Sequence, residues 1–213
     1  MTNGRKEYLE KVMATLNNLK GDFSRIIMHD DSGSKEYRDW LRSKYGHEVI
    51  ASSEGKGFGK AIISAWKAIR KDNNQWVFHL EEDFLIKEPI DAAEMIKVLK
   101  NNPHLIQMAL LRQPIGGRER QKGGIVNSHP ERYFDKSDGV HDWMEHRVNF
   151  TTNPSVYRKT LIDRYPWPDT TYSERVISKQ IFADPNNFCA YWGKRTDPPK
   201  VWHIGDIRTG TGY

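Results

Sequence analysis

Apolar positions in the first half of the chain alternate between helical and strand-like spacing. Residues 5–19 carry leucine, valine and methionine at helical intervals and predict an amphipathic helix. Four short apolar runs predict strands, at 25–28, 48–51, 76–80 and 105–111. Helices are expected at 35–45, directly after the glycines of 55–59, and from 89 to 100. Because strand and helix alternate four times, the pattern predicts an α/β domain with a doubly wound, mostly parallel sheet flanked by helices.

The second half of the chain has no such regular pattern. Residues 112–147 are rich in glycine, histidine and charge, so a long functional loop with one short helix is expected there. Strands are predicted at 148–152 and 188–191, a helix at 173–183, and a mostly irregular tail after Thr196. The chain is therefore interpreted as one domain over residues 1–213 with an elaborated C-terminal portion.

Length and composition narrow the class of protein. A chain of 213 residues points to one domain, and its 24 aromatic residues argue against disorder. Its single cysteine, Cys189, excludes an intrachain disulfide framework and a cysteine-rich zinc site. No apolar run approaches the roughly 18 residues of a membrane helix, and the first 25 residues do not resemble a signal peptide. We therefore expect a soluble, cytoplasmic protein without a membrane partner.

Positive charge is concentrated in the second half. The chain carries a net charge of +5, and residues 107–213 hold 16 basic side chains against 12 acidic ones. This asymmetry is a mild indication of a polyanionic partner for that half, although many ordinary surfaces have the same balance.

Polar motifs stand where predicted strands end. His29-Asp30-Asp31-Ser32 follows one strand, Glu81-Glu82-Asp83 follows another, and the glycine cluster 55–59 precedes a helix. Carboxylates bind a hard divalent cation, the cation neutralises a diphosphate, and glycines allow close backbone approach, so a nucleotide held with a cation fits. The Asp-Asp-Ser sequence also suits a turn or helix cap, and the glycine pattern is neither a dinucleotide fingerprint nor a P-loop. Three adjacent acids repel one another unless a cation neutralises them.

The order of these motifs resembles that of GT-A glycosyltransferases of the family-two kind, and most closely small phage-encoded members. The resemblance rests on the Asp-Asp-Ser turn, the glycine-rich helix start and Trp76-Val-Phe-His-Leu-Glu-Glu-Asp-Phe84, and it continues to the tail 203–213. It implies a single-domain, Rossmann-like GT-A fold in which residues 1–106 bind nucleotide sugar and metal and residues 107–213 bind the acceptor. It further implies metal-dependent, inverting transfer from a UDP-linked sugar, with Mn²⁺ or Mg²⁺, to a hydroxyl group.

The resemblance also implies roles for individual residues. It makes Asp83 a direct metal ligand, lets Glu81 contact the ribose or a metal-bound water, and makes His203 the histidine that completes the metal shell. It assigns donor binding to the following residues: Thr2, Asn3, Arg5, Asp30, Asp31, Gly57 and Arg208. In that family a strand precedes the Thr2-Asn3-Gly4-Arg5 turn and lies beside the Asp30-Asp31 strand. Here we expect either that the start lies upstream or that the sheet is built without this strand.

A catalytic base and an acceptor complete the expectations. Glu174, at the start of the predicted helix 173–183, corresponds to the acidic base of inverting members, and Asp169 is the competing candidate; Glu174 also suits a simple helix-start acid. The acceptor is expected to be a hydroxymethylated pyrimidine in phage DNA, a virion protein or a glycan. Trp143, Trp167 and Trp192 would suit stacking on an extruded base, and they equally suit the core or stacking on a sugar. Competing interpretations are a nucleotidyltransferase and a nucleic-acid-binding protein on an inactive GT-A fold.

Overall fold

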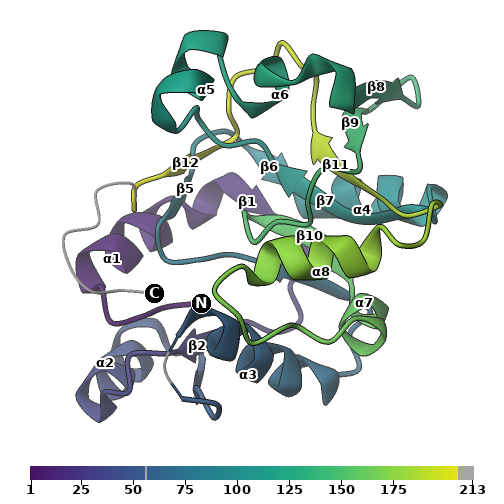
Figure 1. Ribbon diagram of the computed structural model, residues 1–213. Helices are drawn as coiled ribbons and strands as arrows, with labels where there is room; N and C mark the ends of the chain where they lie inside the picture. Colours follow the sequence, from purple (N-terminus) through teal and green to yellow (C-terminus); the bar gives the residue numbers. More distant parts are fainter. Residues whose placement is uncertain (56, 206–213) are drawn as a thin grey trace.

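The predicted alternation of strands and helices is present in the computed structural model, which describes residues 1–55 and 57–205 (Figure 1). The helices of the first half are α1 (Lys6–Ala14), the 3-10 turn η1 (Leu16–Asn18), α2 (Lys35–Tyr45), α3 (Phe58–Arg70) and α4 (Ala92–Asn101). Its strands are β1 (Leu19–Lys20), β2 (Ile27–Asp30), β3 (Glu48–Ala51), β4 (Trp76–His79), β5 (Phe84–Ile86), β6 (Ile90–Asp91) and β7 (Leu105–Leu110). The helix at 35–45 and the strand at 48–51 have the bounds that the sequence predicts.

Local signals explain these bounds. The Ser34 side chain accepts a hydrogen bond from the Tyr37 N–H at 3.1 Å and caps the start of α2. Gly46 ends the same helix with a left-handed φ of 66°, which a glycine adopts without strain. Between these signals, Tyr37 and Leu41 are buried and pack with α1 and β2.

The second half is more regular than its sequence predicts. Its elements are α5 (Gly116–Lys122), α6 (Ile125–Ser128), η2 (Pro130–Arg132), β8 (Tyr133–Ser137), β9 (Asp142–His146), β10 (Ser155–Arg158), α7 (Lys159–Arg164), α8 (Ser173–Ile181), β11 (Phe188–Trp192) and β12 (Val201–His203). The expected long loop at 112–147 is therefore wrong, because it holds two helices and the β8–β9 hairpin. Most of β8 is solvent-exposed and polar, which hides the strand period in the sequence.

The strand predicted at 148–152 is also wrong. Its backbone bonds to side chains instead of a neighbouring strand: the Phe150 N–H donates to Ser178 Oγ at 2.8 Å, and the Thr151 N–H donates to Gln107 Oε1 at 3.1 Å. The strand begins only after Pro154, as β10.

The main sheet is mixed. Its six strands lie in the order β4-β10-β7-β11-β9-β8, and only the β11–β7 pair is parallel. β4, β7 and β11 still run in one direction, as the alternating pattern predicts, but β10 from the second half lies antiparallel between β4 and β7. The α/β prediction is confirmed, and "mostly parallel" is corrected to mixed. β2 and β3 form a separate parallel pair.

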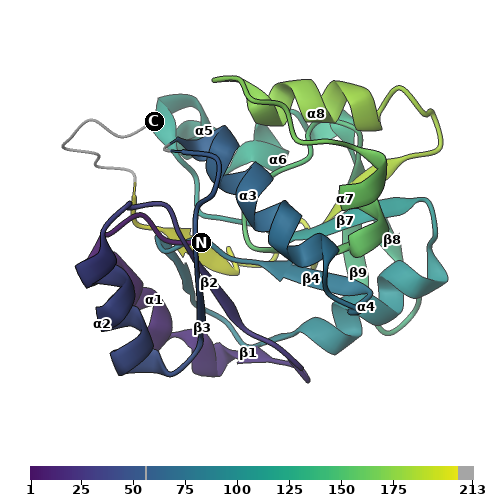
Figure 2. The same cartoon turned by 90° about the horizontal axis from the view of Figure 1, so that it is seen from below.

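Helices cover both faces of this sheet. α4 packs on one face in an apolar cluster with β4, β7, β10 and β11, and α3, α7 and α8 form a second cluster on the other face. The two views in Figures 1 and 2 show α8 and α3 on one side and α1 and α4 on the opposite side. Among the described residues, no helix has the length and apolar character needed to cross a membrane.

Candidate active site

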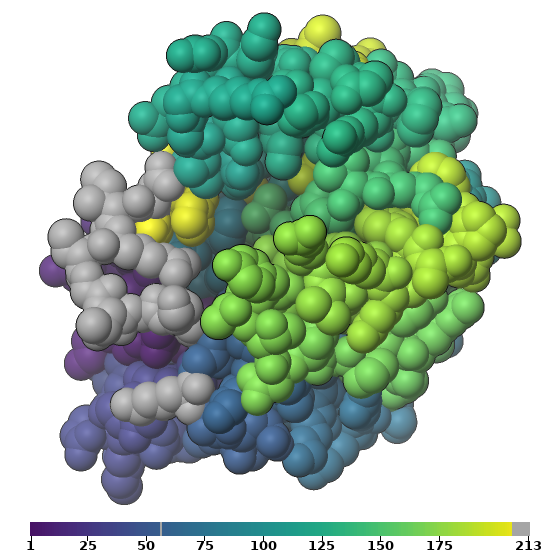
Figure 3. Space-filling view, in the orientation of Figure 1, coloured from purple at the N-terminus to yellow at the C-terminus, as the bar shows by residue number. Residues whose placement is uncertain are grey.

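Four segments that are distant in the sequence meet at the carboxyl ends of β2 and β4. They are residues 2–5, the Asp30-Asp31 pair, the acids 81–83 and the end of β12. The space-filling view shows the molecule hollowed on this side, between α5 above and α8 below (Figure 3). Ligands of open α/β sheets bind outside the carboxyl ends of the strands, so this is the candidate site.

Asp83 is the most buried acid of this group. Its side chain is 0% exposed, and one carboxylate oxygen, Oδ2, contacts Arg5 Nη2 at 3.0 Å and His203 Nε2 at 3.4 Å. Burial acts to raise the pKa of Asp83, but the contacts with His203 and Arg5 outweigh it and hold the pKa below its usual value. Asp83 is therefore ionised at neutral pH.

Glu82, which the sequence analysis leaves without a role, anchors the start of the chain. Its buried carboxylate accepts a hydrogen bond from Arg5 Nε at 2.6 Å and another from the Thr2 hydroxyl, which also contacts the Tyr37 hydroxyl. Arg5 thus pairs with both Glu82 and Asp83. Its guanidinium already compensates the crowded acids, so their proximity alone does not require a metal ion.

Asp83 and His203 nevertheless have the chemistry of cation ligands. Asp83 Oδ1 and His203 Nδ1 are buried, and neither has a hydrogen-bond partner among the described residues. Carboxylate oxygen and imidazole nitrogen both suit Mn²⁺. In the described part of the chain no three His, Cys, Asp or Glu side chains are grouped to hold a metal. In chemistry, Asp83 and His203 thus fit a divalent cation, to which they could offer one carboxylate oxygen and one imidazole nitrogen.

The end of β12 is shaped around Asp83. The Gln113 side chain accepts from the His203 N–H at 2.8 Å and donates to the His203 carbonyl at 2.7 Å, which fixes the backbone of the histidine. A Cβ atom on Gly205 would lie only 2.3 Å from Asp83 Oδ2, so the backbone reaches the carboxylate only because this residue is a glycine.

The two aspartates at the end of β2 face different surroundings. Asp30 pairs with Arg38 at 3.0 Å and accepts from the Ser32 N–H at 2.9 Å, so its carboxylate is engaged with α2 and the turn. Asp31 Oδ2 accepts from the Gly57 N–H at 3.2 Å, and Asp31 lines a small pocket. The pocket lining also includes Thr2, Asn3, Arg5, Glu81 and Phe58. Of the pair, Asp31 is the one beside the predicted donor residues.

We expect Asp31→Ala to weaken UDP binding by about 5- to 150-fold, the loss of about 1–3 kcal/mol from a buried charged acceptor. Asp31→Asn keeps a carbonyl oxygen and should lose less. Asp30→Ala should instead lower the unfolding temperature, because it leaves the partly buried Arg38 without its carboxylate. Calorimetry with UDP and thermal unfolding of all three variants test this, and equal UDP affinity in wild type and Asp31→Ala contradicts it.

Glu174 is held in the site by the segment before β10. Its Oε1 accepts from the Thr152 N–H at 2.7 Å and from the Thr152 hydroxyl at 3.0 Å. Burial raises the pKa of Glu174 above its usual value, against these hydrogen bonds, and the negative charge of Glu81 adds to the rise. Glu81 lies in turn 3.5 Å from His79 Nε2. A carboxylate with a raised pKa, fixed in position near the donor residues, is suited to general-base catalysis.

The remaining predicted residues are placed less centrally. Asp169 is exposed, and its Oδ1 would lie 3.5 Å from a Cβ on Gly59, so it covers the start of α3. Gly57 caps α3 with a φ of 120°. Arg208 lies outside the described residues.

Residues 2–182 match the model of glycosyl transferase family 2. The chain belongs to this family. No curated protein matches it.

Solved structures support the GT-A-like fold of this family 2 chain. It is similar to S. aureus TarS 1-349 in complex with UDP-GlcNAc, at 16% identity and a TM-score of 0.60 over 99% of this chain and 58% of that one. It is also similar to GalNAc-T7 with UDP, GalNAc and Mn²⁺, at 11% identity and a TM-score of 0.63 over 92% and 41%. A CMP:2-keto-3-deoxy-manno-octonic acid synthetase complexed with CTP matches at 13% identity and a TM-score of 0.53 over 90% and 81%.

The chain spans less than two thirds of the length of two solved structures with a similar fold. It covers 65% of a mycobacterial protein and 58% of TarS 1-349. Because a CMP:2-keto-3-deoxy-manno-octonic acid synthetase has a similar fold, the fold alone does not separate a sugar transferase from a nucleotidyltransferase. The family model covers 181 of the 213 residues and shows the family of the chain.

Sequence reasoning missed three residues of this family 2 site: Glu82, Gln113 and Thr152. Gln113 sits in a segment read as loop, and its partner His203 is 90 residues away, so no local signal links them. Thr152 lies in the segment that the sequence predicts as a strand, and no local signal indicates its contact with Glu174.

Proposed function

We propose that this chain is a metal-dependent, inverting glycosyltransferase that moves a sugar from a UDP-linked donor to a hydroxyl group. The observation that carries the proposal is the environment of the Glu174 carboxylate. Two hydrogen bonds from Thr152 fix its position, and burial together with the negative charge of Glu81 raises its pKa. The family match and the UDP complexes of TarS and GalNAc-T7 support the donor class.

The reaction is a single displacement. Glu174 accepts the proton of the acceptor hydroxyl as its oxygen forms a bond to the anomeric carbon. The bond from that carbon to the diphosphate breaks, and UDP leaves with the electron pair. Asp31 accepts the uracil N3–H and Glu81 contacts the ribose. Asp83 and His203 would hold a divalent cation, Mn²⁺ or Mg²⁺, which would supply positive charge to neutralise the departing diphosphate.

The acceptor is proposed only as a hydroxyl group. Two of the three tryptophans expected to stack on a DNA base are structural: Trp143 and Trp167 are 4% and 6% exposed and belong to the two main core clusters. Trp192 is partly buried and packs against the same core. The hydroxymethylated-DNA acceptor therefore loses this support, and it stands beside protein and glycan acceptors as something for experiment to separate.

We expect the purified chain to release UDP from UDP-glucose or UDP-GlcNAc in the presence of Mn²⁺, and to lose that activity in EDTA. Hydroxymethylated DNA, a protein lysate and simple glycans are supplied in parallel, and mass analysis identifies which acquires a hexose. Recovery on adding Mn²⁺ back separates metal removal from irreversible inactivation. Undiminished turnover in EDTA contradicts the metal assignment.

Two other results would favour the competing interpretations. Pyrophosphate release from a nucleoside triphosphate would identify a nucleotidyltransferase. DNA binding with no release of UDP from any donor would identify a nucleic-acid-binding protein that has kept only the fold.

A further inference from the structure

The most exposed aromatic ring among the described residues belongs to Tyr172, beside the proposed base. Its side chain is 71% exposed, and it directly precedes α8, which carries Glu174 two residues further on. α8 forms the lower border of the hollow in Figure 3. Single exposed aromatic residues are common on protein surfaces. One that stands next to the carboxylate proposed to receive the acceptor's proton requires an explanation of its own.

The fold gives no reason for an aromatic residue at this position. Among the described residues, the Tyr172 side chain makes no hydrogen bond, ion pair or ring contact. Its backbone N–H donates to Thr170 Oγ1 at 3.4 Å, and its carbonyl accepts from the Val176 N–H at 3.1 Å. Tyr172 also stands just before the first helical residue, where serine, threonine, aspartate or asparagine would stabilise a helix, and it forms no such cap. Neither packing nor capping accounts for the ring.

The segment that carries Tyr172 is fixed to the core. The buried Trp167 ring packs edge-on against Trp66 of α3, with 5.2 Å between the ring centroids. A Cβ atom on Gly59 would lie 3.3 Å from the Pro168 carbonyl oxygen, so the segment lies directly against the first turn of α3. Because its backbone is held in this way, Tyr172 can bind a ligand at little cost in ordering the chain.

The surface around the ring is polar and has no excess of positive charge. Residues 166–180 contain two acidic and two basic side chains, which are Asp169, Glu174, Arg175 and Lys179. Thr170 and Thr171 are exposed beside the ring. Nucleic acids are bound by clusters of lysine and arginine, and an extruded base is enclosed in a close-fitting pocket. A largely exposed ring on an electrically balanced segment suits neither requirement.

We propose that Tyr172 is an acceptor-binding residue that stacks on the ring of a neutral sugar and so brings one sugar hydroxyl to Glu174. The face of an aromatic ring carries partial negative charge. The C–H groups on one face of a pyranose carry partial positive charge, so the two faces attract each other. The sugar hydroxyls point outward from the ring and can still bond to water and to the hydroxyls of Thr170 and Thr171. This inference rests on the proposed function and narrows its acceptor to a neutral glycan.

Stacking holds the acceptor but supplies no group to the chemical step. Tyr172→Ala should therefore raise the acceptor KM by at least about tenfold and change kcat much less. Tyr172→Phe keeps the aromatic face and should stay within about threefold of the wild-type KM. A fall in kcat with an unchanged KM would contradict a binding role. Calorimetry with UDP should give one affinity for all three proteins, because donor binding is assigned to other residues.

A binding test without a donor separates this inference from the proposed function. The full chain is applied to an array that carries neutral glycans, anionic glycans, hydroxymethylated DNA and peptides. Wild type should bind members of the neutral set best. Tyr172→Ala should lower that binding by at least about tenfold, and Tyr172→Phe by less than about threefold. The unfolding temperature of Tyr172→Ala should stay within about 2 °C of wild type, since the ring supports no packing.

Phe134→Ala is the matched control. Phe134 is 53% exposed and lies in β8, at the opposite edge of the six-stranded sheet from β4. Its removal takes away an exposed ring elsewhere on the surface and should leave glycan binding as in wild type. An equal loss of binding in Phe134→Ala and Tyr172→Ala would mean that exposed rings bind the array non-specifically, and would refute the assignment.

Three further results would overturn the proposal. They are undiminished glycan binding by Tyr172→Ala, no binding of wild type to any neutral glycan, and stronger binding of wild type to anionic glycans, DNA or peptides than to the neutral set. Neutral-glycan binding that depends on Tyr172, in a chain that releases no UDP from any donor, would refute the proposed function and leave this binding site standing.

Discussion

Glu174→Gln is expected to lower turnover by about 10²–10⁴-fold while UDP affinity stays within about twofold of wild type. Glutamine keeps the size of the side chain and an oxygen that accepts from Thr152, but it takes up no proton at neutral pH. Because donor binding is assigned to other residues, only the rate of the chemical step should fall. UDP release and calorimetry with UDP, measured on the same preparations, separate the two effects.

The pH profile gives an independent check on the same residue. A general base must be ionised, so activity should fall as the pH drops through the pKa of Glu174, and burial places that pKa above its ordinary value of 4.5. Thr152→Val removes the hydroxyl donor that stabilises the carboxylate, so it should move this limb to still higher pH. In Glu174→Gln the limb should disappear from the residual activity.

Asp169→Asn is the matched control, because it removes the charge of the competing carboxylate, which is exposed beside α3. It should retain most activity. If Asp169→Asn is inactive and Glu174→Gln is active, the base is misassigned. Glu174, at the start of α8, then serves only to bind Thr152.

Asp83→Asn should abolish transfer while leaving the protein folded. Asparagine preserves the shape and an oxygen for Arg5, but it loses the negative charge that holds a cation beside His203. Turnover measured across a Mn²⁺ titration should show no recovery at any metal concentration that leaves the protein soluble. Circular dichroism and the unfolding temperature establish that the loss is not unfolding.

Glu82→Gln is the control for Asp83→Asn. It neutralises the adjacent acid, which bonds Thr2 and Arg5 and does not contact His203. We expect it to lower the unfolding temperature and to keep the Mn²⁺ dependence of wild type. If Glu82→Gln loses activity completely and Asp83→Asn retains it, the acid that serves the cation is Glu82, and the ligand assignment is wrong.

Features that depend on near neighbours along the chain could be predicted from the amino-acid sequence. Helical spacing and a serine cap define α2, and an apolar run defines β3, because these signals lie within a few residues of one another. The motifs that end strands were equally visible, since strand ends are marked locally by polar residues and glycines. In the β8–β9 hairpin, exposed charged residues in β8 mask the alternation of apolar and polar positions, so the sequence did not predict this hairpin.

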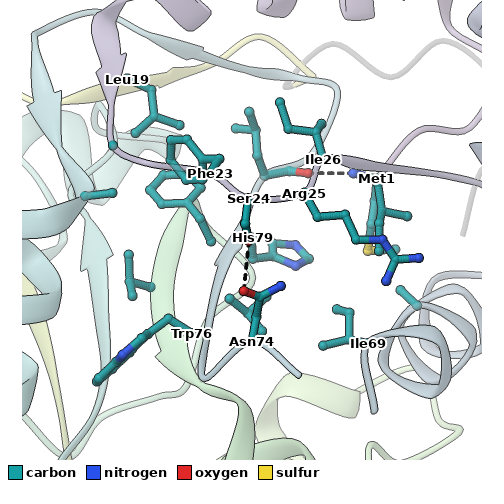
Figure 4. A pocket seen from close by; sticks show the side chains of 18 of the residues that line it. Met1, Leu19, Phe23, Ser24, Arg25, Ile26, Ile69, Asn74, Trp76 and His79 are labelled. Carbon is teal, nitrogen blue, oxygen red and sulfur yellow. Dashed lines mark hydrogen bonds between the residues drawn. The ribbon is translucent and has the colours of Figure 1, made fainter. Parts of the chain in front are cut away.

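The relations between distant segments became visible only in the folded structure. It placed β10 between β4 and β7, engaged Asp30 with Arg38 while leaving Asp31 beside Gly57, and paired Arg5 with two acids nearly 80 residues away. It also revealed an apolar cavity of about 730 Å³ between β2 and β4 (Figure 4). Adjacent residues of a strand point to opposite sides, and which side faces a ligand or a salt bridge depends on packing partners that no local pattern encodes.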